Sequence, residues 1–400
     1  MGALSGIKII DLSRVLAGPY ATQMLGDMGA DIIKIEKPFA GDDTRAWGPP
    51  FLEGTHESAY YLSINRNKKS LAVDISKPEG QKILHALLKD ADILIENFKV
   101  GSLEKYTLDY ASLAPLYPKL IYASITGFGQ KGVLSTEPGY DLVAQAISGL
   151  MSVTGEPEGA PMKVGVAVSD ILAGLHVTIG ILAALQSRAR TGHGQMVDVS
   201  LLDCTLASLT NLAQYYLTAG HSAPRFGNAH STIVPYQAFE AADGWLVLAV
   251  GNDGQFKKLC TLLNQSAWAD DNRFTTNPAR VQNRAVLIPL LEDAIKKFMV
   301  ADFIEKCRAA DIPAGPVQTI DQVINSQTIK ERDMVTQMMH GSGTPTKLIG
   351  SPLKFSKTPV NYNLPPPQCG AHTYEILQEL GYSGAQIDEL YNRKIIEIMR

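Results

Sequence analysis

Hydrophobic and polar positions over residues 1–130 alternate between short apolar runs and amphipathic stretches. The apolar runs are rich in Ile, Leu and Val, which predicts buried strands, and they lie at residues 7–12, 31–36, 71–75, 93–95 and 120–123. A helix is predicted over 18–28, and a second one follows Ser76 and Glu79, which have the spacing of a capping box. Strands that alternate with helices form parallel sheets, so the pattern predicts an α/β fold that begins with a Rossmann-like domain.

The most apolar stretch of the chain follows Asp170 and predicts a helix over 171–185. A helix that is apolar on every side is buried, so Asp170 is expected at the edge of the core. The free N–H groups and the dipole of the helix start favour the ionised carboxylate, whereas partial burial disfavours it and removes water from its oxygens. An ionised and poorly hydrated carboxylate is a usable nucleophile, although Asp170 could equally serve only as a helix cap. At about 15 residues the helix is too short for a membrane span.

A chain of 400 residues exceeds what one core usually holds, so we expect two domains. The large domain is expected over 1–224 and a small domain over 225–330, which includes a strand at 245–250. Residues 331–400 form a Pro- and Gly-rich path that ends in a short amphipathic helix with Ile376, and such a segment usually packs back on another part of the molecule.

Composition and charge narrow the functional class. Hydrophobic residues make up 45% of the chain, and 36 basic residues stand against 40 acidic ones. This is the composition of an ordinary soluble globular protein without the charge pattern of a nucleic-acid or membrane-binding protein. The four cysteines are far apart, which indicates free and mostly buried thiols in a reducing compartment. With no basic and apolar leader at its start, the chain is expected in the cytoplasm.

Several familiar catalytic motifs are missing from the sequence. There is no G-x-G-x-x-G after the first strand, no P-loop, no G-x-S-x-G and no H-E-x-x-H, and no two of the eight histidines are spaced i, i+4. A dinucleotide and a metal site are therefore not expected. Polar stretches at 41–45, 65–70 and 251–254 are each either ligand contacts or solvated turns. The residues alone indicate an α/β enzyme for an anionic small molecule, with Asp170 as a candidate reactive group.

A set of short motifs resembles the class III CoA-transferases, the formyl-CoA transferase and CaiB/BaiF group. These motifs are RVLAGPY at 14–20, NRNKKS at 65–70, ENF at 96–98, SITGFGQ at 124–130, GYD at 139–141, SD at 169–170, TGHGQ at 191–195 and PYQ at 235–237. The resemblance extends over essentially the whole chain. The stretches GDDTR at 41–45, WGPPF at 47–51 and AH at 229–230 are most similar to the succinyl-CoA:glutarate (hydroxymethylglutarate) branch.

The resemblance implies an open-ring monomer, with a large Rossmann-like domain and a smaller α/β domain, interlocked with a second copy in a homodimer. It implies no permanently bound cofactor, since coenzyme A thioesters and a small carboxylic acid are the substrates. Asp170 falls on the family's nucleophile. It would form a mixed anhydride with the donor acyl group, then an aspartyl-CoA thioester, and then a second anhydride with the acceptor, which retains the energy of the thioester.

Other site residues are implied by position in the motifs. Lys37 and Lys68 match basic residues near the CoA phosphates, Tyr140 lies at the acyl end, and Arg45 would pair with the distal carboxylate of a dicarboxylate substrate. A mobile loop that covers the intermediates corresponds to Gly251, Asn252, Asp253 and Gly254. The remaining CoA-site positions are Val15, Ala17, Asn97, Phe98 and Lys105.

Two departures from the family pattern bear on the substrate. Leu16 stands where formyl-CoA transferases carry a glutamine, and the glycine run at 251–254 is shorter. Both departures argue against formyl-CoA and oxalate as natural substrates. From the branch resemblance and Arg45 we predict a transferase from succinyl-CoA to a dicarboxylate such as glutarate, with formyl-CoA, oxalate or carnitine as alternatives. A racemase of α-methylacyl-CoA would need a histidine where this chain has Tyr140. A non-catalytic CoA-binding protein is the alternative outside enzymes, and the intact Asp170 argues against it.

Overall fold

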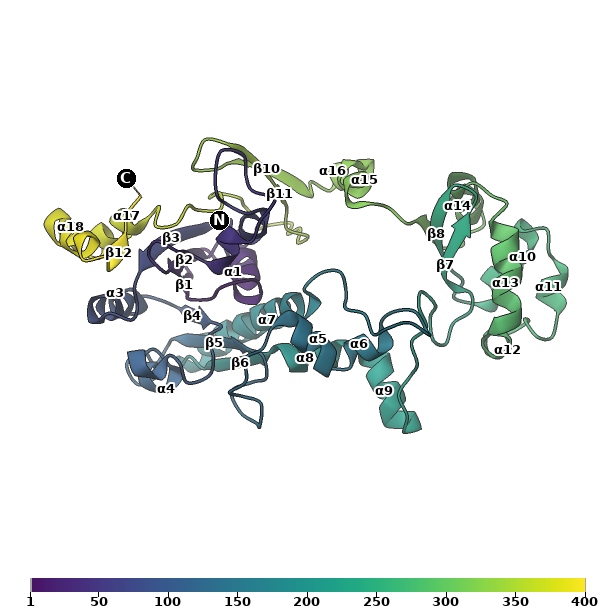
Figure 1. Ribbon diagram of the computed structural model, residues 1–400, viewed down its shortest axis with the longest axis horizontal. Helices are drawn as coiled ribbons and strands as arrows, with labels where there is room; N and C mark the ends of the chain where they lie inside the picture. Colours follow the sequence, from purple (N-terminus) through teal and green to yellow (C-terminus); the bar gives the residue numbers. More distant parts are fainter. Residues whose placement is uncertain (1, 400) are drawn as a thin grey trace. The chain divides into compact units, whose positions relative to one another are not determined.

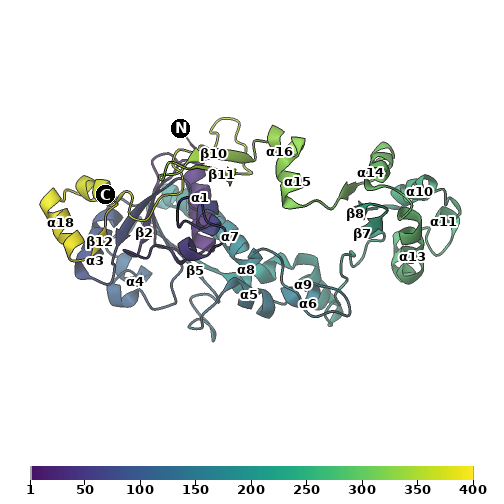
Figure 2. The ribbon, with the colours of Figure 1, turned by 45° about the horizontal axis from the view of Figure 1, so that its top comes forward.

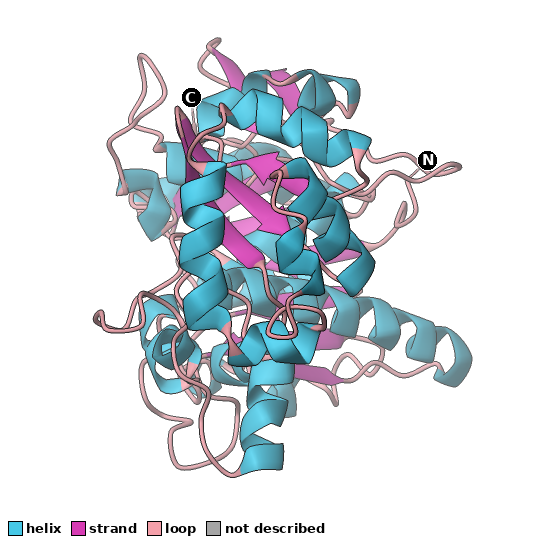
Figure 3. Ribbon diagram, turned by 90° about the vertical axis from the view of Figure 1, so that its right-hand side faces the viewer, coloured by secondary structure: helices cyan, strands magenta, loops and turns pink. Residues whose placement is uncertain are grey.

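The computed structural model describes residues 2–399, which divide into a large and a small unit. The large unit consists of the chain up to residue 150, residues 164–221 and the chain from residue 328 onward. The small unit consists of residues 151–163 and 222–327. The predicted boundaries at 224 and 330 lie close to these, but the sequence did not indicate that 151–163 belongs to the small unit. Both units contain helices and strands, and Figure 3 colours the two kinds of element along the described chain.

The large unit is built on a seven-stranded sheet of order β12-β3-β2-β1-β4-β5-β6 (Figure 1). All neighbours are parallel except β12, which runs antiparallel beside β3. The strand order from β3 to β6 is that of a Rossmann-like sheet, so the predicted α/β fold is confirmed. All five predicted strands are present, whereas β6 and β12 were not predicted. The strands are β1 (Lys8–Asp11), β2 (Asp31–Glu36), β3 (Lys68–Val73), β4 (Ile93–Glu96), β5 (Ile121–Thr126), β6 (Met196–Ser200) and β12 (Ile396–Glu397).

Helices cover both faces of this sheet. One face packs against α3 (Pro78–Leu88), α4 (Tyr110–Leu113), α17 (Thr373–Glu379) and α18 (Gly384–Asn392), so the C-terminal segment returns to the large unit (Figures 1 and 2). The other face packs against α1 (Ala17–Asp27), α5 (Asp141–Ile147), α7 (Val168–Thr191) and α8 (Leu201–Ser208). The other elements that lie wholly or mostly in the large unit are η1 (Asp43–Ala46), α2 (Ala59–Ser63), η2 (Glu104–Tyr106), α9 (Thr210–Ala219), α16 (Gln327–Glu331), β10 (Val335–Met339) and β11 (Pro345–Ile349). Helix α6 (Leu150–Val153) lies mostly in the small unit.

Helix α7 differs from its prediction in length and in burial. It runs for 24 residues, because a polar tail after Leu185 continues the helix until Gly192, whose φ of 78° ends it. By length and composition it could cross a membrane, with a mean hydropathy of 1.9, a test that core helices of soluble proteins also pass. Its inner face is buried in the core of the large unit, but Leu175, Ile179 and Leu182 form an exposed apolar stripe. The prediction of a helix buried on every side is therefore wrong for this chain taken alone.

The structure also tests two smaller predictions, the capping box at Ser76 and the free cysteines. The capping box expected at Ser76 is absent, because the N-cap of α3 is Lys77, and the Ser76 hydroxyl donates instead to Asp74 Oδ1 at 2.6 Å. The predicted free cysteines are confirmed. All four thiols are unpaired, and Cys369 alone among them is not fully buried.

The small unit has its own core around a three-stranded antiparallel sheet of order β7-β8-β9. Phe239, Leu246, Phe256 and Phe303 are among its fully buried side chains. Its elements are β7 (Tyr236–Ala241), β8 (Gly244–Ala249), β9 (Ala314–Pro316), α10 (Asp253–Leu262), α11 (Ala267–Asp270), α12 (Asn277–Gln282), α13 (Arg284–Ile295), α14 (Val300–Ala309) and α15 (Ile320–Asn325).

Candidate active site

The candidate site lies where the order of the parallel strands reverses, between β1 and β4. At such a reversal the loops after the two strands diverge and leave a crevice at the carboxyl ends of the strands. A cleft of about 200 Å³ opens at this place in the large unit. Its lining residues are 14–17, 43, 97–100, 125–127, 135, 137–140, 170 and 201. A larger cleft, of about 390 Å³, lies where β1 and β2 begin, and none of the predicted site residues lines it.

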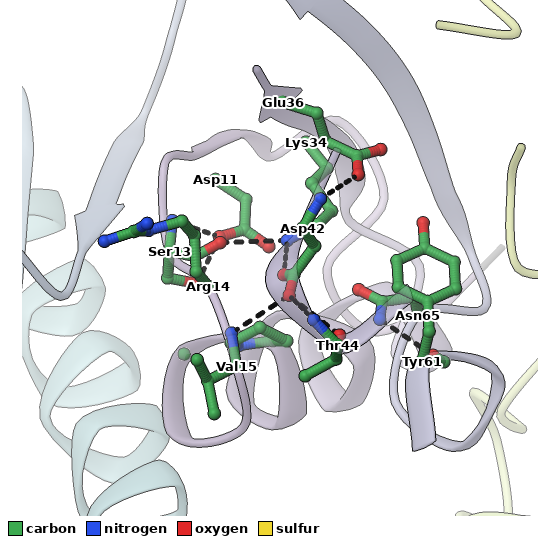
Figure 4. Close-up of polar contacts among 12 residues, drawn as sticks. Asp11, Ser13, Arg14, Val15, Lys34, Glu36, Asp42, Thr44, Tyr61 and Asn65 are labelled. Carbon is green, nitrogen blue, oxygen red and sulfur yellow. Dashed lines mark hydrogen bonds and ion pairs between the residues drawn. The ribbon is translucent and has the colours of Figure 1, made fainter. Parts of the chain in front are cut away.

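The loop between β1 and α1 forms one wall of the cleft. The Asn97 side chain binds the backbone of Arg14 in both directions, accepting from its N–H at 2.8 Å and donating to its carbonyl at 2.6 Å. The next residue, Val15, has a φ of 70°, which is rare for a β-branched residue. Its N–H donates to Asp42 Oδ1 at 3.3 Å, which helps to hold this conformation (Figure 4).

Buried charges behind this loop fix it further. Lys34 Nζ lies 2.9 Å from Asp42 Oδ2 and also donates to the Ser13 carbonyl at 2.9 Å (Figure 4). Burial alone would raise the pKa of Asp42, but Lys34 and hydrogen bonds from Thr44 outweigh it and lower that pKa to about 2. A buried pair of this kind is costly to break, because the remaining charge would lie unpaired in the core. The buried ion pair therefore holds this wall of the cleft in place at the carboxyl end of the central strand β1.

Helix α1 starts at this wall and lies directly against α7. No side chain caps its N-terminus, where Leu16 and Ala17 line the cleft. Across from it, Gly174 of α7 packs so closely that a Cβ at that position would lie 2.8 Å from the Ala17 carbonyl oxygen. Since Gly174 is one helical turn beyond Asp170, this contact sets the separation between Asp170 and the start of α1.

Asp170 lies in the first turn of α7, half-buried in the lining of the cleft. Its carboxylate accepts no hydrogen bond from any of residues 2–399. Burial, followed by the charge of Asp141, raises the pKa of Asp170 to about 7. Of the two opposing effects expected from the sequence, burial therefore outweighs the helix N-terminus. The Asp170 carboxylate is poorly solvated and only partly ionised at neutral pH.

Asp141, the first residue of α5, caps α7 in place of Asp170. Its Oδ1 accepts from the Ser169 N–H at 2.8 Å and from the Asp170 N–H at 3.4 Å. Its Oδ2 accepts from Gln145 Nε2 at 2.6 Å, and the Gln145 side chain also accepts from the Val164 N–H at 2.9 Å. Asp141 belongs to one of the sequence motifs, but the sequence did not reveal that it caps α7, because this role depends on the contact between α5 and α7.

Two tyrosines lie near the Asp170 carboxylate. Tyr140 precedes α5, is exposed and lines the cleft. Tyr60, which sequence reasoning missed, is half-buried; burial, followed by the charges of Asp170 and Asp141, raises its pKa to about 12. Its ring meets the edge of Trp47 at a centroid distance of 5.4 Å. Tyr60 therefore stays a neutral phenol close to both carboxylates.

Comparison with known proteins gives a consistent result. Residues 4–373 match the model of CoA-transferase family III. The chain is 46% identical to succinate–glutarate CoA-transferase of Agrobacterium fabrum, over 94% of this chain and 95% of that protein. It is 42% identical to succinyl-CoA:glutarate CoA-transferase of Mus musculus, over 99% of this chain and 91% of that one. A crystal structure of a CAIB/BAIF family protein from Brucella suis superposes with a TM-score of 0.85 at 44% identity, covering 95% and 99% of the two chains.

The chain belongs to CoA-transferase family III. It is therefore a CoA-transferase, and its substrates are CoA thioesters. The family resemblance found in the motifs is confirmed over nearly the full length. Among residues 2–399, no group of three or more His, Cys, Asp or Glu side chains could hold a metal ion.

Six residues assigned to the transferase site by resemblance come together in the cleft. They come from the loops after β1 and β4 and from the starts of α1, α5 and α7, and they are Val15, Ala17, Asn97, Phe98, Tyr140 and Asp170. Arg14, on the same wall, stacks over the Phe98 ring at 5.1 Å. The convergence of four sequence-distant segments on one cleft supports the assignments, while the contact of each residue with a substrate stays a prediction.

Arg45 does not have the position expected for a substrate contact. Its guanidinium is buried and bidentate to Glu36, with 2.8 and 2.7 Å contacts, and it also donates to Glu57 at 2.7 Å and to Tyr61 Oη at 2.5 Å. These partners occupy the fork that a distal carboxylate would need. The predicted role of Arg45 in dicarboxylate recognition is therefore corrected to a structural one.

Lys68 is likewise corrected. Its Nζ is fully buried under α1, where it donates to the Pro19 carbonyl and to Asn65 Oδ1, both at 2.9 Å, and lies 3.4 Å from Asp11. Burial lowers its pKa to about 7, with Asp11 opposing the shift. Because its ammonium group is enclosed in this way, Lys68 cannot contact a CoA phosphate at the surface of the protein.

The remaining predicted residues lie elsewhere. Lys37 and Lys105 are exposed and are not part of the cleft lining, so their contact with phosphates stays a prediction. Gly251–Gly254 belong to the small unit and form the start of α10, where Asn252 Oδ1 accepts from the Gln255 N–H at 2.9 Å. Asp253 pairs with the fully buried Arg280 at 2.9 Å. A covering role for this loop also stays a prediction.

Proposed function

We propose that this transferase moves CoA from succinyl-CoA to a small dicarboxylate such as glutarate, with Asp170 as the nucleophile. The observation that carries the proposal is the Asp170 carboxylate, which is half-buried in the cleft and accepts no hydrogen bond from the described residues. A carboxylate without donors keeps its electron pairs available for attack. The names of the relatives from Agrobacterium fabrum and Mus musculus support the choice of donor and acceptor.

The proposed reaction proceeds by four acyl transfers. The Asp170 carboxylate attacks the donor thioester carbonyl, the C–S bond breaks, and a mixed anhydride and CoA thiolate form. The thiolate attacks the aspartyl carbonyl, which releases succinate and leaves an aspartyl-CoA thioester. The acceptor carboxylate attacks that carbonyl and releases the thiolate again. The thiolate then attacks the acceptor's carbonyl in the second anhydride, which gives the new acyl-CoA and restores the Asp170 carboxylate.

The proposed binding mode follows the walls of the cleft. The backbone at Val15 and Ala17 and the side chains of Asn97 and Phe98 would hold the CoA chain beside Asp170. N–H groups at the uncapped start of α1 favour negative charge, as developing oxyanions and thiolates require. Tyr140 would border the acyl group. The exposed cations Lys37 and Lys105 are proposed for the CoA phosphates, and the segment 251–254 for covering the anhydrides from water.

We further propose that the enzyme works as an interlocked homodimer in the cytoplasm. Exposed apolar side chains also lie on other helices of the large unit, α5, α8 and α9, and together with those of α7 they are Leu142, Val143, Ile147, Leu175, Ile179, Leu182, Leu206, Tyr216 and Leu217. Large exposed apolar side chains in such numbers are typical of a protein interface. Four unpaired thiols suit a reducing compartment.

The test is a mass-spectrometric assay of CoA exchange. The purified protein is incubated with succinyl-CoA and one acceptor at a time: glutarate, hydroxymethylglutarate, itaconate, citramalate, oxalate, formate or carnitine. We expect the wild type to form a new acyl-CoA with the dicarboxylate acceptors. We expect Asp170→Ala to form no new acyl-CoA with any acceptor. Absence of exchange with every acceptor, together with α-proton exchange on a branched acyl-CoA, would show a racemase instead.

A further inference from the structure

We propose that Asp141 is a positioning residue that occupies the N-terminal amides of α7 and so keeps the Asp170 carboxylate free for attack. The inference deepens the proposed function, because it explains how an aspartate in the first turn of a helix remains a nucleophile. An aspartate in that place usually binds the free N–H groups of its own helix. Here a second carboxylate has taken them.

The hydrogen bonds around the start of α7 carry the argument. The N-cap residue, Ala167, has no side chain that can cap the helix. Asp141 Oδ1 therefore accepts from the Ser169 and Asp170 N–H groups, at 2.8 and 3.4 Å. Gln145, which is fully buried, holds the other oxygen of Asp141 at 2.6 Å. Asp141 is thus fixed from both sides, while the Asp170 side chain has no donor.

The two carboxylates differ because of this arrangement. Asp141 receives three N–H donors, which stabilise its charge, whereas Asp170 is left with burial and with the negative charge beside it. A carboxylate with a raised pKa is a stronger nucleophile once it is ionised. One acid therefore caps the helix, and the other is kept reactive by the first.

Other titratable groups face Asp170 from the elements around it. Tyr60 of α2 lies close enough for both carboxylates to raise its pKa, and it bears no charge at neutral pH. Arg14, Lys99 and Glu137 line the same cleft without forming an ion pair with Asp170, and Arg14 is paired with Asp43 at 3.3 Å. Asp141 differs from these groups because it accepts hydrogen bonds from the N–H groups of the same helix start.

The experiment measures protonation of Asp170 without requiring activity. A water-soluble carbodiimide with glycine amide modifies protonated carboxyl groups, and peptide mass spectrometry reads the modification of Asp170 between pH 5 and pH 9. The variant is Asp141→Asn, whose Oδ1 can still accept from the Ser169 N–H. The matched control is Asp109→Asn, which removes the same charge from an aspartate that caps α4 outside the cleft.

We expect the labelling midpoint of Asp170 to move toward lower pH by about one unit in Asp141→Asn and to stay in place in Asp109→Asn. The acid limb of the CoA-exchange rate should move with it, and the plateau rate should fall. An unchanged midpoint in Asp141→Asn, with or without loss of stability, would overturn the proposal. A shifted midpoint in Asp141→Asn, together with a wild type that exchanges no CoA, would instead contradict the proposed function.

Discussion

The contact between Gly174 and the start of α1 leads to a prediction with a defined magnitude. In Gly174→Ala, the new Cβ would lie 2.8 Å from the Ala17 carbonyl oxygen and 3.1 Å from Tyr20 Cδ1. The first of these is closer than Cβ atoms approach backbone oxygens in proteins, so α1 and α7 must separate by a few tenths of an ångström. Ala17 lines the cleft opposite Asp170, so the separation widens the site itself.

Two effects on stability oppose each other in this variant. Alanine is favoured over glycine inside a helix by about 1 kcal/mol. Overpacking of a close helix contact costs about 1–3 kcal/mol. The net loss in the free energy of unfolding is therefore expected to be small, about 0–2 kcal/mol. Activity should fall much further, since displacement of reacting groups by up to 1 Å can cost on the order of 100-fold in rate.

The assay compares CoA-exchange kinetics and denaturant unfolding for Gly174→Ala and a control in the same helix. Gly180→Ala makes the same substitution six residues later, where the new Cβ would lie 2.6 Å from the Cγ1 atom of Val197. This control also crowds the helix, but against a side chain outside the cleft lining. We expect the control to keep nearly full activity. A Gly174→Ala enzyme with wild-type kcat/KM, or one that loses activity only in proportion to its unfolding, would refute the reasoning.

Three further predictions concern charge. Arg45→Met should cost about 3–5 kcal/mol in the free energy of unfolding, measured by denaturant titration, because Glu36 and Glu57 lose their buried partner, and it should not change acceptor preference. Arg393→Met, which removes a surface ion pair, is the control and should leave the unfolding midpoint nearly unchanged. The rate of CoA exchange should rise about tenfold per pH unit below pH 7 and level off above it, as Asp170, with its pKa of about 7, loses its proton. Asp170→Asn should have a larger free energy of unfolding than the wild type at pH 8, by up to about 4 kcal/mol, because the pKa of Asp170 is raised from 3.8 to about 7 in the folded state and the charged form destabilises that state once the pH exceeds the unfolded value. At pH 4 the difference should nearly vanish.

The sheet of the large unit was predictable because its strands are continuous apolar runs. Residues 31–36 form β2 as predicted, and Ile93–Glu96 of β4 is fully buried, as a strand covered on both faces must be. Strand β6 was missed because its residues are only partly buried, and β12 because two residues leave no periodic signal. The length of α7 was underestimated because its polar last turns lack the apolar pattern that predicted its first part.

The candidate site was predictable only through the family motifs. The resemblance assigned Val15, Asn97 and Asp170 to one site, and the structure gives the physical reason, since the loops after β1 and β4 and the start of α7 converge at the strand reversal. Charge alone was misleading for Arg45 and Lys68. Arginine and lysine are residue types that commonly bind anionic ligands. In the folded chain, however, Arg45 pairs with buried Glu36 and Lys68 with buried Asp11. The capping of α7 by Asp141 also depends on a tertiary contact between helices.

The most direct test of the central claim is to trap the covalent intermediate. The enzyme is mixed with succinyl-CoA without acceptor and quenched in hydroxylamine, which converts an acyl anhydride or thioester of an aspartate to a hydroxamate, and peptide mass spectrometry locates the modified residue. We predict modification of Asp170 in the wild type and in Asp109→Asn, and none of the corresponding peptide in Asp170→Ala. CoA exchange that proceeds while Asp170 stays unmodified, or that persists in Asp170→Ala, would contradict the assignment of Asp170 as the nucleophile.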